Sequence, residues 1–240
     1  MRSVLNLAWK EIRQIFLSPI AYTFLSVFVF FVIFFFFRDF FAVSQATMDG
    51  FFGLFPIAFS VVIPGLAMRM WAEERRGGTI EFLLTSPIET WHIVLAKFLA
   101  GLALVVLCVV MTLYVPWTVS EFGPLDKGPV VGGYLGAIFL GATFIAVAMF
   151  LSSFTQDQVV SLLVGAIVLL ALVLVGHPIV TDEFSPGGWA ASFTRAISPT
   201  TRYQSIGRGV IDVRDLFYFV AMTGFFLYLN VRAIDLRRWR

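Results

Sequence analysis

Six long apolar segments constrain this chain more than any other feature of its sequence. They cover residues 19–37, 51–70, 93–115, 132–150, 159–176 and 216–231. An α-helix rises about 1.5 Å per residue, so a segment of about 20 residues matches a hydrocarbon core about 30 Å thick. Only 13% of the residues are charged, whereas soluble domains carry about 25%. The segments therefore predict one all-α polytopic membrane domain over residues 1–240, with six transmembrane helices.

Residues 1–18 are predicted to form an amphipathic interface helix that lies on the membrane. Lys10, Arg13 and Gln14 fall on the polar face of this helix. Its apolar face, spaced at the helical period, consists of Leu5, Ala8, Trp9, Ile12, Ile15 and Phe16. The alternative is a simple cationic flank of the first span. The period of the apolar residues and a tryptophan suited to the interface favour the helix.

A densely charged segment, residues 71–92, separates the second and third apolar segments. From Arg69 to Lys97 the chain carries eight charged residues, which at about 3 kcal/mol each would cost on the order of 20 kcal/mol in lipid. The segment is therefore expected at or beyond a membrane surface. In the simplest alternative, Glu73 and Arg76 form an ordinary i,i+3 pair that only solvates a loop.

Two short helices are predicted within this charged segment. Thr79 follows two glycines and can cap the first helix, which places Glu81 favourably in its first turn. Ser86 and Pro87 match the start of a second helix that runs into the third span. Two helices joined at a corner would form a rigid projection with residues 80–84 as its apolar part.

The distribution of Lys and Arg predicts how the chain is oriented. With a cytoplasmic N-terminus, eleven of the 17 Lys and Arg residues fall on the cytoplasmic side and six on the other side. Because cytoplasmic loops carry the excess of positive charge, both termini, residues 71–92 and the turn at 152–158 are predicted to be cytoplasmic. Residues 177–214 are then extracytoplasmic. Their broken apolar pattern predicts re-entrant or interfacial helices, followed by a cap at Asp212 and Asp215 that opens the sixth span.

Prolines and a glycine interrupt the second span. They are Pro56, Pro64 and Gly65. Proline removes a backbone donor and favours a kink, which membrane helices tolerate where neighbouring groups bond to the freed carbonyls. These residues are hinge candidates, and the alternative is that they are ordinary prolines of a membrane helix.

Small residues recur at four-residue spacing in the fourth span. Gly132 and Gly136 form one series, and Gly133, Ala137 and Gly141 form the other. This spacing allows the backbones of two helices to approach closely. It predicts a helix-packing face, whose partner belongs either to the same chain or to a second copy.

Several classes of site have little support in the sequence. The single cysteine, Cys108, lies in an apolar run, and His92 and His177 are not spaced as ligands on one helix. We therefore expect no metal site, no catalytic residues and no cofactor bound by this chain. Its basic residues lie in flanks and loops, which argues against nucleic-acid binding. The chain also lacks a Gly-x-x-x-x-Gly-Lys-Ser/Thr phosphate loop.

Short motifs spread over nearly the whole chain carry a family resemblance. They are Lys10-Glu11 with Ser18-Pro19, Met68-Arg69, residues 73–81 (EERRGGTIE), residues 83–88 (LLTSPI) and residues 205–215 (SIGRGVIDVRD). Together they resemble the permeases of ABC-2 type transporters, and most closely the gliding-motility-associated type. The resemblance implies six spans with an interface helix, a coupling helix between spans two and three, and broken re-entrant helices before span six.

The resemblance also implies partners and contact residues. Two permease subunits would assemble with two ABC ATPase subunits, which would hold ATP and Mg²⁺, in the bacterial inner (plasma) membrane. The gliding type implies a second permease copy or a different membrane subunit with an extracytoplasmic domain. The implied ATPase contacts are Glu73, Glu74, Arg75, Arg76, Gly77, Gly78, Thr79, Ile80, Glu81, Phe82, Leu83, Leu84, Ser86, Pro87 and Glu89, with a lesser contact at Gln156 and Asp157.

The leading hypothesis is a permease subunit that couples ATP hydrolysis by a partner to export or movement of a lipidic or bulky substrate. The nearly uncharged spans favour such a substrate over protons or metal ions. A membrane anchor of an ATP-driven mechanical or assembly complex is the alternative, because the same motifs would serve it. An intramembrane protease built on Glu73 and Glu74 is disfavoured, since it would need further histidines at membrane depth.

Overall fold

Six helical segments are long and apolar enough to cross a membrane. The computed structural model describes residues 2–43, 47–78, 89–176, 197–209 and 212–238, and all regular secondary structure in these ranges is helical. The candidate spans are Pro19–Phe41, Asp49–Arg76, Thr90–Ser120, Lys127–Ser152, Gln158–Val175 and Val213–Leu236. The predicted all-α polytopic fold class is therefore confirmed.

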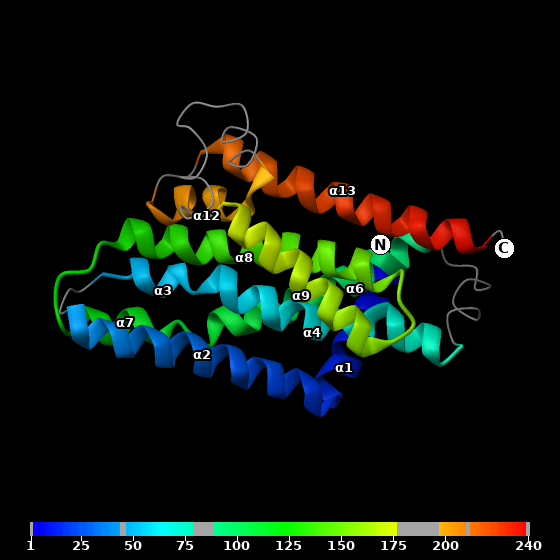
Figure 1. Ribbon diagram of the computed structural model, residues 1–240, viewed down its shortest axis with the longest axis horizontal. Helices are drawn as coiled ribbons and strands as arrows, with labels where there is room; N and C mark the ends of the chain where they lie inside the picture. Colours follow the sequence, from blue (N-terminus) through cyan, green and yellow to red (C-terminus); the bar gives the residue numbers. More distant parts are fainter. Residues whose placement is uncertain (1, 44–46, 79–88, 177–196, 210–211, 239–240) are drawn as a thin grey trace.

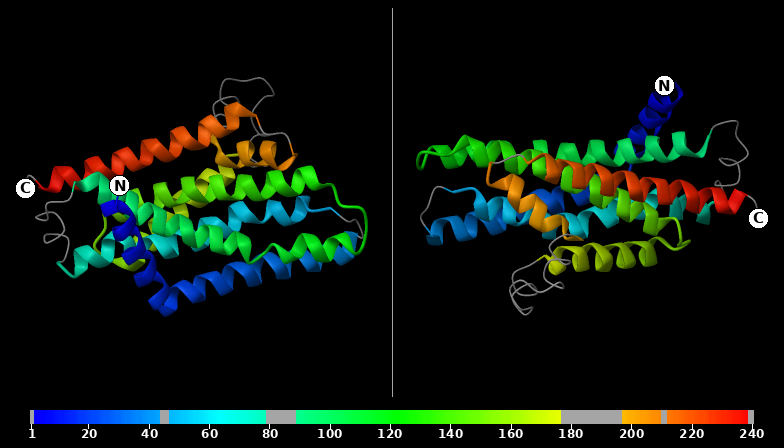
Figure 2. Two further views of the ribbon diagram at one scale, coloured as in Figure 1. Left: turned by 180° about the vertical axis from the view of Figure 1, so that it is seen from behind. Right: turned by 90° about the horizontal axis from the view of Figure 1, so that it is seen from above.

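The helices form an elongated bundle (Figure 1). They are α1 (Arg2–Leu17), α2 (Pro19–Val43), α3 (Asp49–Gly53), α4 (Phe55–Arg76), α6 (Thr90–Val110), α7 (Tyr114–Ser120), α8 (Lys127–Ser152), α9 (Gln158–Val175), α12 (Pro199–Gly207) and α13 (Val213–Arg238). The long helices run along the bundle, and α1 is set at an angle to them (Figure 2). Both termini lie toward the same end as the last turn of α4, the start of α6 and the α8–α9 turn. We call this the terminal end.

The core of the bundle lies between α4, α6 and α8. These three spans are buried over most of their length, whereas only a small part of α2, α9 and α13 is buried, which leaves these helices suited to face lipid. Aromatic side chains fill the space between α2 and α4. Phe28 stacks on Phe59 at 5.1 Å and meets Phe55 edge-on at 5.5 Å. Part of the phenylalanine-rich first span is thus core, and part of it remains on the surface.

The interface helix α1 packs partly against protein. Ala8 is buried, and Leu7, Ile15 and Phe16 pack against the core of the bundle, with most of the contacts of α1 made to α6. Trp9 remains exposed, as a helix at a membrane interface requires. The apolar face predicted for this helix is therefore divided between α6 and the surface.

The second span consists of a short helix followed by a long one. Proline in the first turn of a helix is compatible with helical geometry, and Pro56 occupies this place in α4, directly after the break at Leu54. Pro64 lies inside α4, which continues past it to Arg76. Pro56 therefore begins a helix rather than interrupting one, and the helix ends later than the predicted residue 70.

The small residues of α8 pack against other parts of the same chain. A Cβ on Gly132 would lie 2.3 Å from the carbonyl oxygen of Ile206, and one on Gly141 would lie 2.4 Å from the Val105 side chain. A Cβ on Gly133 would meet Phe52 at 2.5 Å, and one on Gly136 would meet Tyr203 at 3.0 Å. Ala137 is fully buried. The sequence left open whether this face of α8 packs within the subunit or against a second copy. In the structure it packs against α3, α6 and α12 of the same chain.

Gly132→Val should destabilise the chain, because the added side chain meets a backbone oxygen that cannot rotate away. Overpacking of this kind costs about 1–3 kcal/mol. Thermal unfolding in detergent should show a lower midpoint for this variant. The matched control is Gly224→Val in α13, where a Cβ has no neighbour within 4 Å. An equal decrease of the unfolding midpoint in the two variants would show that the effect comes from the helix propensity of valine and not from contact with Ile206.

Part of the predicted re-entrant stretch, residues 177–214, is described. It contains α12, whose Tyr203 donates a hydrogen bond to the Phe52 carbonyl at 3.0 Å. Asp212 caps α13 by accepting a hydrogen bond from the Arg214 amide at 2.9 Å. Asp215 takes no part in this cap and instead pairs with Arg202 at 3.0 Å. Residues 177–196 and 210–211 lie outside the described ranges, as do residues 79–88 of the predicted coupling helix.

Candidate functional site

The last turn of α4 carries the first of the residues expected to contact an ATPase. Glu73, Glu74, Arg75 and Arg76 continue the helix of the second span. The helix stops at the two glycines that follow, where the Gly77 amide donates to the Glu73 carbonyl at 2.9 Å and Gly78 has a φ of 66°. That left-handed conformation suits glycine and ends helices. The charged turn is therefore a rigid extension of a membrane-spanning helix.

Lys97 holds three helices together at the terminal end. Its ammonium lies 2.7 Å from Glu74 Oε1 of α4 and 3.2 Å from Glu11 Oε2 of α1, and its side chain is only 2% exposed. The same ammonium lies 5.2 Å from the centre of the Trp71 ring, which is itself fully buried. Buried charges are tolerated when they are paired and hydrogen-bonded. Lys97, expected in the surface charge cluster, is thus a buried link between α1, α4 and α6.

Arg69 makes the second ion pair of this region. Its guanidinium binds both carboxylate oxygens of Glu73, at 2.7 and 2.9 Å, and it also donates to the Ser18 hydroxyl at the start of α2. The pair is of the i,i+4 kind that stabilises helices. The Glu73 carboxylate binds Arg69, so the i,i+3 pairing with Arg76 considered for a solvated loop is not the one observed.

Arg75 connects the end of α4 to the α8–α9 turn. Its Nη1 donates hydrogen bonds to the carbonyl oxygens of Ser153 and Thr155, each at 2.9 Å. Gln156 and Asp157 follow directly and are exposed. The Asp157 carboxylate caps α9 by accepting from the Val159 amide at 2.7 Å. The structure therefore brings the end of α4, with Arg75, close to the α8–α9 turn, which lies far from it in sequence.

Glu89 is the first described residue after the gap at residues 79–88. It is the N-cap residue of α6, and its carboxylate accepts from the indole of Trp91 and lies 3.6 Å from His92 Nδ1. A second bond fixes the start of α6, since Thr90 donates to Asp235 of α13 at 2.6 Å. The intervening contact residues lie outside the described ranges: Thr79, Ile80, Glu81, Phe82, Leu83, Leu84, Ser86 and Pro87.

The hinge candidates lie in tightly packed surroundings. A Cβ on Gly65 would lie 2.1 Å from the Phe24 ring, so α2 approaches α4 closely at this point. On the other side, a Cβ on Gly165 of α9 would lie 3.0 Å from Pro64. Pro64 and Gly65 thus lie where α4 meets both α2 and α9. A bend of α4 there would have to move both neighbours.

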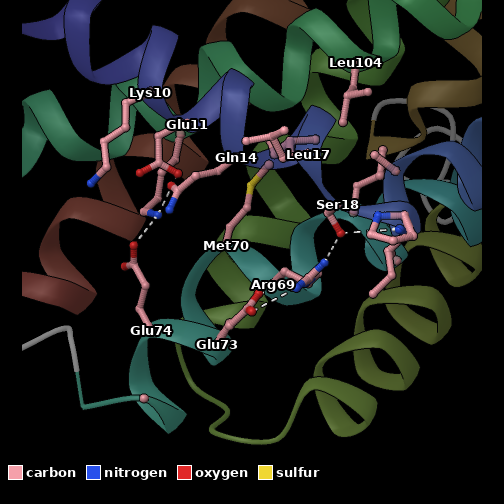
Figure 3. Close-up of a pocket in the computed structure, with 18 of the residues that line it drawn as sticks. Lys10, Glu11, Gln14, Leu17, Ser18, Arg69, Met70, Glu73, Glu74 and Leu104 are labelled. Carbon is pink, nitrogen blue, oxygen red and sulfur yellow. Dashed lines mark hydrogen bonds and ion pairs between the residues drawn. The ribbon is translucent and has the colours of Figure 1, made fainter.

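A cavity of about 960 Å³ opens between α1, α2, α4 and α6, beside the cluster formed by Lys97, Glu11 and Glu74 (Figure 3). Its charged lining includes Lys10, Glu11, Arg69, Glu73, Glu74 and Lys97, and its apolar lining includes Ile20, Ala21, Leu66 and Leu104. Among the described residues, no group of three or more His, Cys, Asp or Glu is placed to bind a metal ion. The region offers charged contacts and an amphiphilic cavity.

Sequence reasoning missed the partners of Lys97. Glu11 is the only acidic residue of α1, and Lys97 is the only charged residue of α6. A lone charge inside an apolar segment is a signal for a buried partner. The sequence contained this signal, although it did not show which acidic residues pair with Lys97.

Comparison with known protein families identifies a match for this chain. A family model described as "ABC-2 family transporter protein" matches residues 5–234. A search of curated proteins returned no match. The family match covers every helix of the terminal end described above, apart from the first residues of α1 and the last residues of α13.

Proposed function

The chain belongs to the ABC-2 transporter family, and we propose that it is the permease subunit of a transporter driven by separate ATPase chains. The observation that carries this proposal is the bonding of Arg75 to the Ser153 and Thr155 carbonyls. It joins the end of α4 and the α8–α9 turn, which are the two places where the sequence predicts ATPase contacts. A docking partner would thus meet one continuous, rigid surface.

The proposed mechanism transmits force through α4. ATP binding would close the ATPase chains and displace the charged turn that ends α4. The link through Arg75 would carry the α8–α9 turn along, and Lys97 would carry α1 and α6. Packed helices move as rigid bodies between discrete arrangements, so the spans would change tilt together. Pro64 and Gly65, packed between α2 and α9, are the proposed point of bending.

The proposed assembly contains two ATPase chains, which hold ATP and Mg²⁺. A second permease copy, or a different membrane subunit with an extracytoplasmic domain as in the gliding-motility type, would complete it. The terminal end would face the cytoplasm of a bacterium, with both termini on that side of the inner membrane. The mostly uncharged spans support a lipidic or bulky substrate, because an ion path would need polar groups at membrane depth.

Cross-linking from single cysteines should test the docking surface. The chain has one natural cysteine, Cys108, which is buried, so an introduced cysteine can be labelled selectively. We expect Gln156→Cys with a short bifunctional reagent to cross-link to the ATPase in the assembled complex. Phe122→Cys is the matched control, because Phe122 is exposed and follows α7 by two residues, and α7 lies toward the opposite end of the bundle (Figure 1). Cross-linking from Phe122→Cys alone would contradict the proposal.

Reconstitution into vesicles with the ATPase should then distinguish a transporter from the membrane anchor of a mechanical complex. Hydrolysis accompanied by flux would support a transporter. Hydrolysis without flux of any amphiphile offered would instead support the membrane anchor of a mechanical complex. Failure of any ATPase to copurify with the chain would contradict both forms of the proposal.

A further inference from the structure

The cavity beside Lys97 has a charged end and an apolar end. Leu104 lies seven residues beyond Lys97 on α6, so the cavity extends about 10 Å along that helix from its charged end. Leu66 and Ala21 contribute further apolar surface from α4 and α2. The volume of about 960 Å³ lies at the upper end of the range of about 300–1,000 Å³ usual for ligand pockets. An elongated amphiphile matches this lining.

The charged end is balanced in sign. Three cations and three carboxylates line it: Lys10, Arg69, Lys97, Glu11, Glu73 and Glu74. Lys97 already pairs with Glu11 and Glu74, and Arg69 pairs with Glu73, so an anionic headgroup without a cation would compete with these carboxylates and a cationic headgroup would compete with these cations. A headgroup with one phosphate and one amine can place each charge beside its opposite. Arginine and lysine bind phosphate, and a primary ammonium can donate three hydrogen bonds to carboxylates.

We propose that this cavity binds a membrane lipid whose zwitterionic headgroup carries a primary amine. The phosphate lies beside Lys10, and the ammonium lies toward the carboxylates of Glu11 and Glu74 on the same side of the cavity (Figure 3). An acyl chain follows the apolar lining toward Leu66 and Leu104. Leu17 and Pro19 are exposed at the rim, so a lipid can enter from the bilayer beside α2. The inference does not depend on coupling to an ATPase.

A lipid fits this place better than a soluble zwitterion. A soluble molecule would occupy the charged end and leave water against the apolar lining, which disfavours that state. The acyl chain of a bilayer lipid can instead cover this lining, so that no water has to remain against it. In this view the lipid fills the angle between α1 and α2 and stabilises the position of the interface helix.

Lipid binding can be measured directly on the purified full-length chain. The chain is placed in nanodiscs that contain phosphatidylethanolamine, phosphatidylcholine or phosphatidylglycerol, and bound lipid is counted by native mass spectrometry. We expect roughly tenfold preference for phosphatidylethanolamine over phosphatidylglycerol, equivalent to about 1.4 kcal/mol. Equal retention of these two lipids would overturn the headgroup assignment. A preference for phosphatidylcholine would overturn the requirement for a primary amine.

Two pairs of variants locate the bound lipid. Leu66→Trp should fill the apolar end and abolish retention, whereas Val61→Trp, on the same helix but 54% exposed and outside the cavity lining, should not. Lys10→Glu should lower retention of phosphatidylethanolamine, and Arg13→Glu, exposed on the same helix and outside the lining, should leave it unchanged.

A milder variant keeps the test decisive if Leu66→Trp does not fold. Ala21→Leu adds three carbon atoms to the cavity from α2 and should lower retention of phosphatidylethanolamine at least about threefold, or roughly 0.65 kcal/mol. Unchanged retention in Ala21→Leu, with the protein folded, would show that the lipid lies elsewhere and overturn the proposal. The same outcome in Lys10→Glu would overturn the role of the charged end.

Discussion

Replacing Lys97 by methionine should destabilise the folded chain by about 3–5 kcal/mol, the usual cost of removing one partner from a buried ion pair. The side chains have similar lengths, so the loss comes from charge rather than from volume. Without the ammonium, the carboxylates of Glu11 and Glu74, which both now approach Lys97, would face each other across a buried space. Thermal unfolding in detergent, followed by the fluorescence of a thiol probe for Cys108, would measure the change.

Two further variants test whether the loss of stability in Lys97→Met comes from the buried ion pairs. Arg13→Met removes a cation from an exposed position of α1 and should leave the unfolding midpoint close to that of the wild type. Lys97→Met combined with Glu11→Gln and Glu74→Gln should recover most of the lost stability, because uncharged side chains no longer repel. A single Lys97→Met variant as stable as the wild type would refute the structural role of the cluster.

Replacing Arg75 by glutamine should separate ATP hydrolysis from movement of the spans, if the chain works as the proposed permease. The variant loses the charged donor that binds the Ser153 and Thr155 carbonyls, and hydrogen bonds to charged groups contribute about 1.5–3 kcal/mol each. We expect flux per ATP hydrolysed to fall about tenfold or more, equivalent to at least 1.4 kcal/mol. The assembled complex should still form.

Conservative changes refine the Arg75 test. Arg75→Lys retains the charge but not the forked geometry of guanidinium, so it should give an intermediate ratio of flux to hydrolysis. Arg13→Gln, exposed on α1, provides the control for loss of a basic residue. If Arg75→Gln leaves the ratio unchanged, the connection between α4 and the α8–α9 turn is not the path of coupling.

Much of the fold follows from the distribution of apolar residues. Each of the six predicted segments overlaps one span, because a chain in lipid must satisfy its backbone bonds within helices. Helix ends were less predictable. The charged residues at 73–76 predict that the helix of the second span has ended, yet α4 continues through them, because Glu73 and Glu74 are paired with Arg69 and Lys97.

Tertiary partners were the part that the sequence did not determine. The spacing of Gly132 and Gly136 predicted a close approach of two backbones, but only the structure shows that α12 of the same chain makes it. Arg75 lies near the end of α4, at Arg76, and Gln156 lies just before the start of α9, at Gln158. Their common surface depends on hydrogen bonds between residues about 80 positions apart, which no local pattern encodes.

The pairing of Glu11 with Lys97 also determines how the bundle sits in its bilayer. Lys97 is fixed in α6, so α1 cannot rise or sink relative to the spans unless this bond breaks or α6 moves with it. A helix with Trp9 exposed on its surface follows the headgroup level. If α1 lies at the headgroup level as predicted, a thinner or thicker bilayer would pull on the three helices that meet at Lys97, and the load would reach α4 through Glu74.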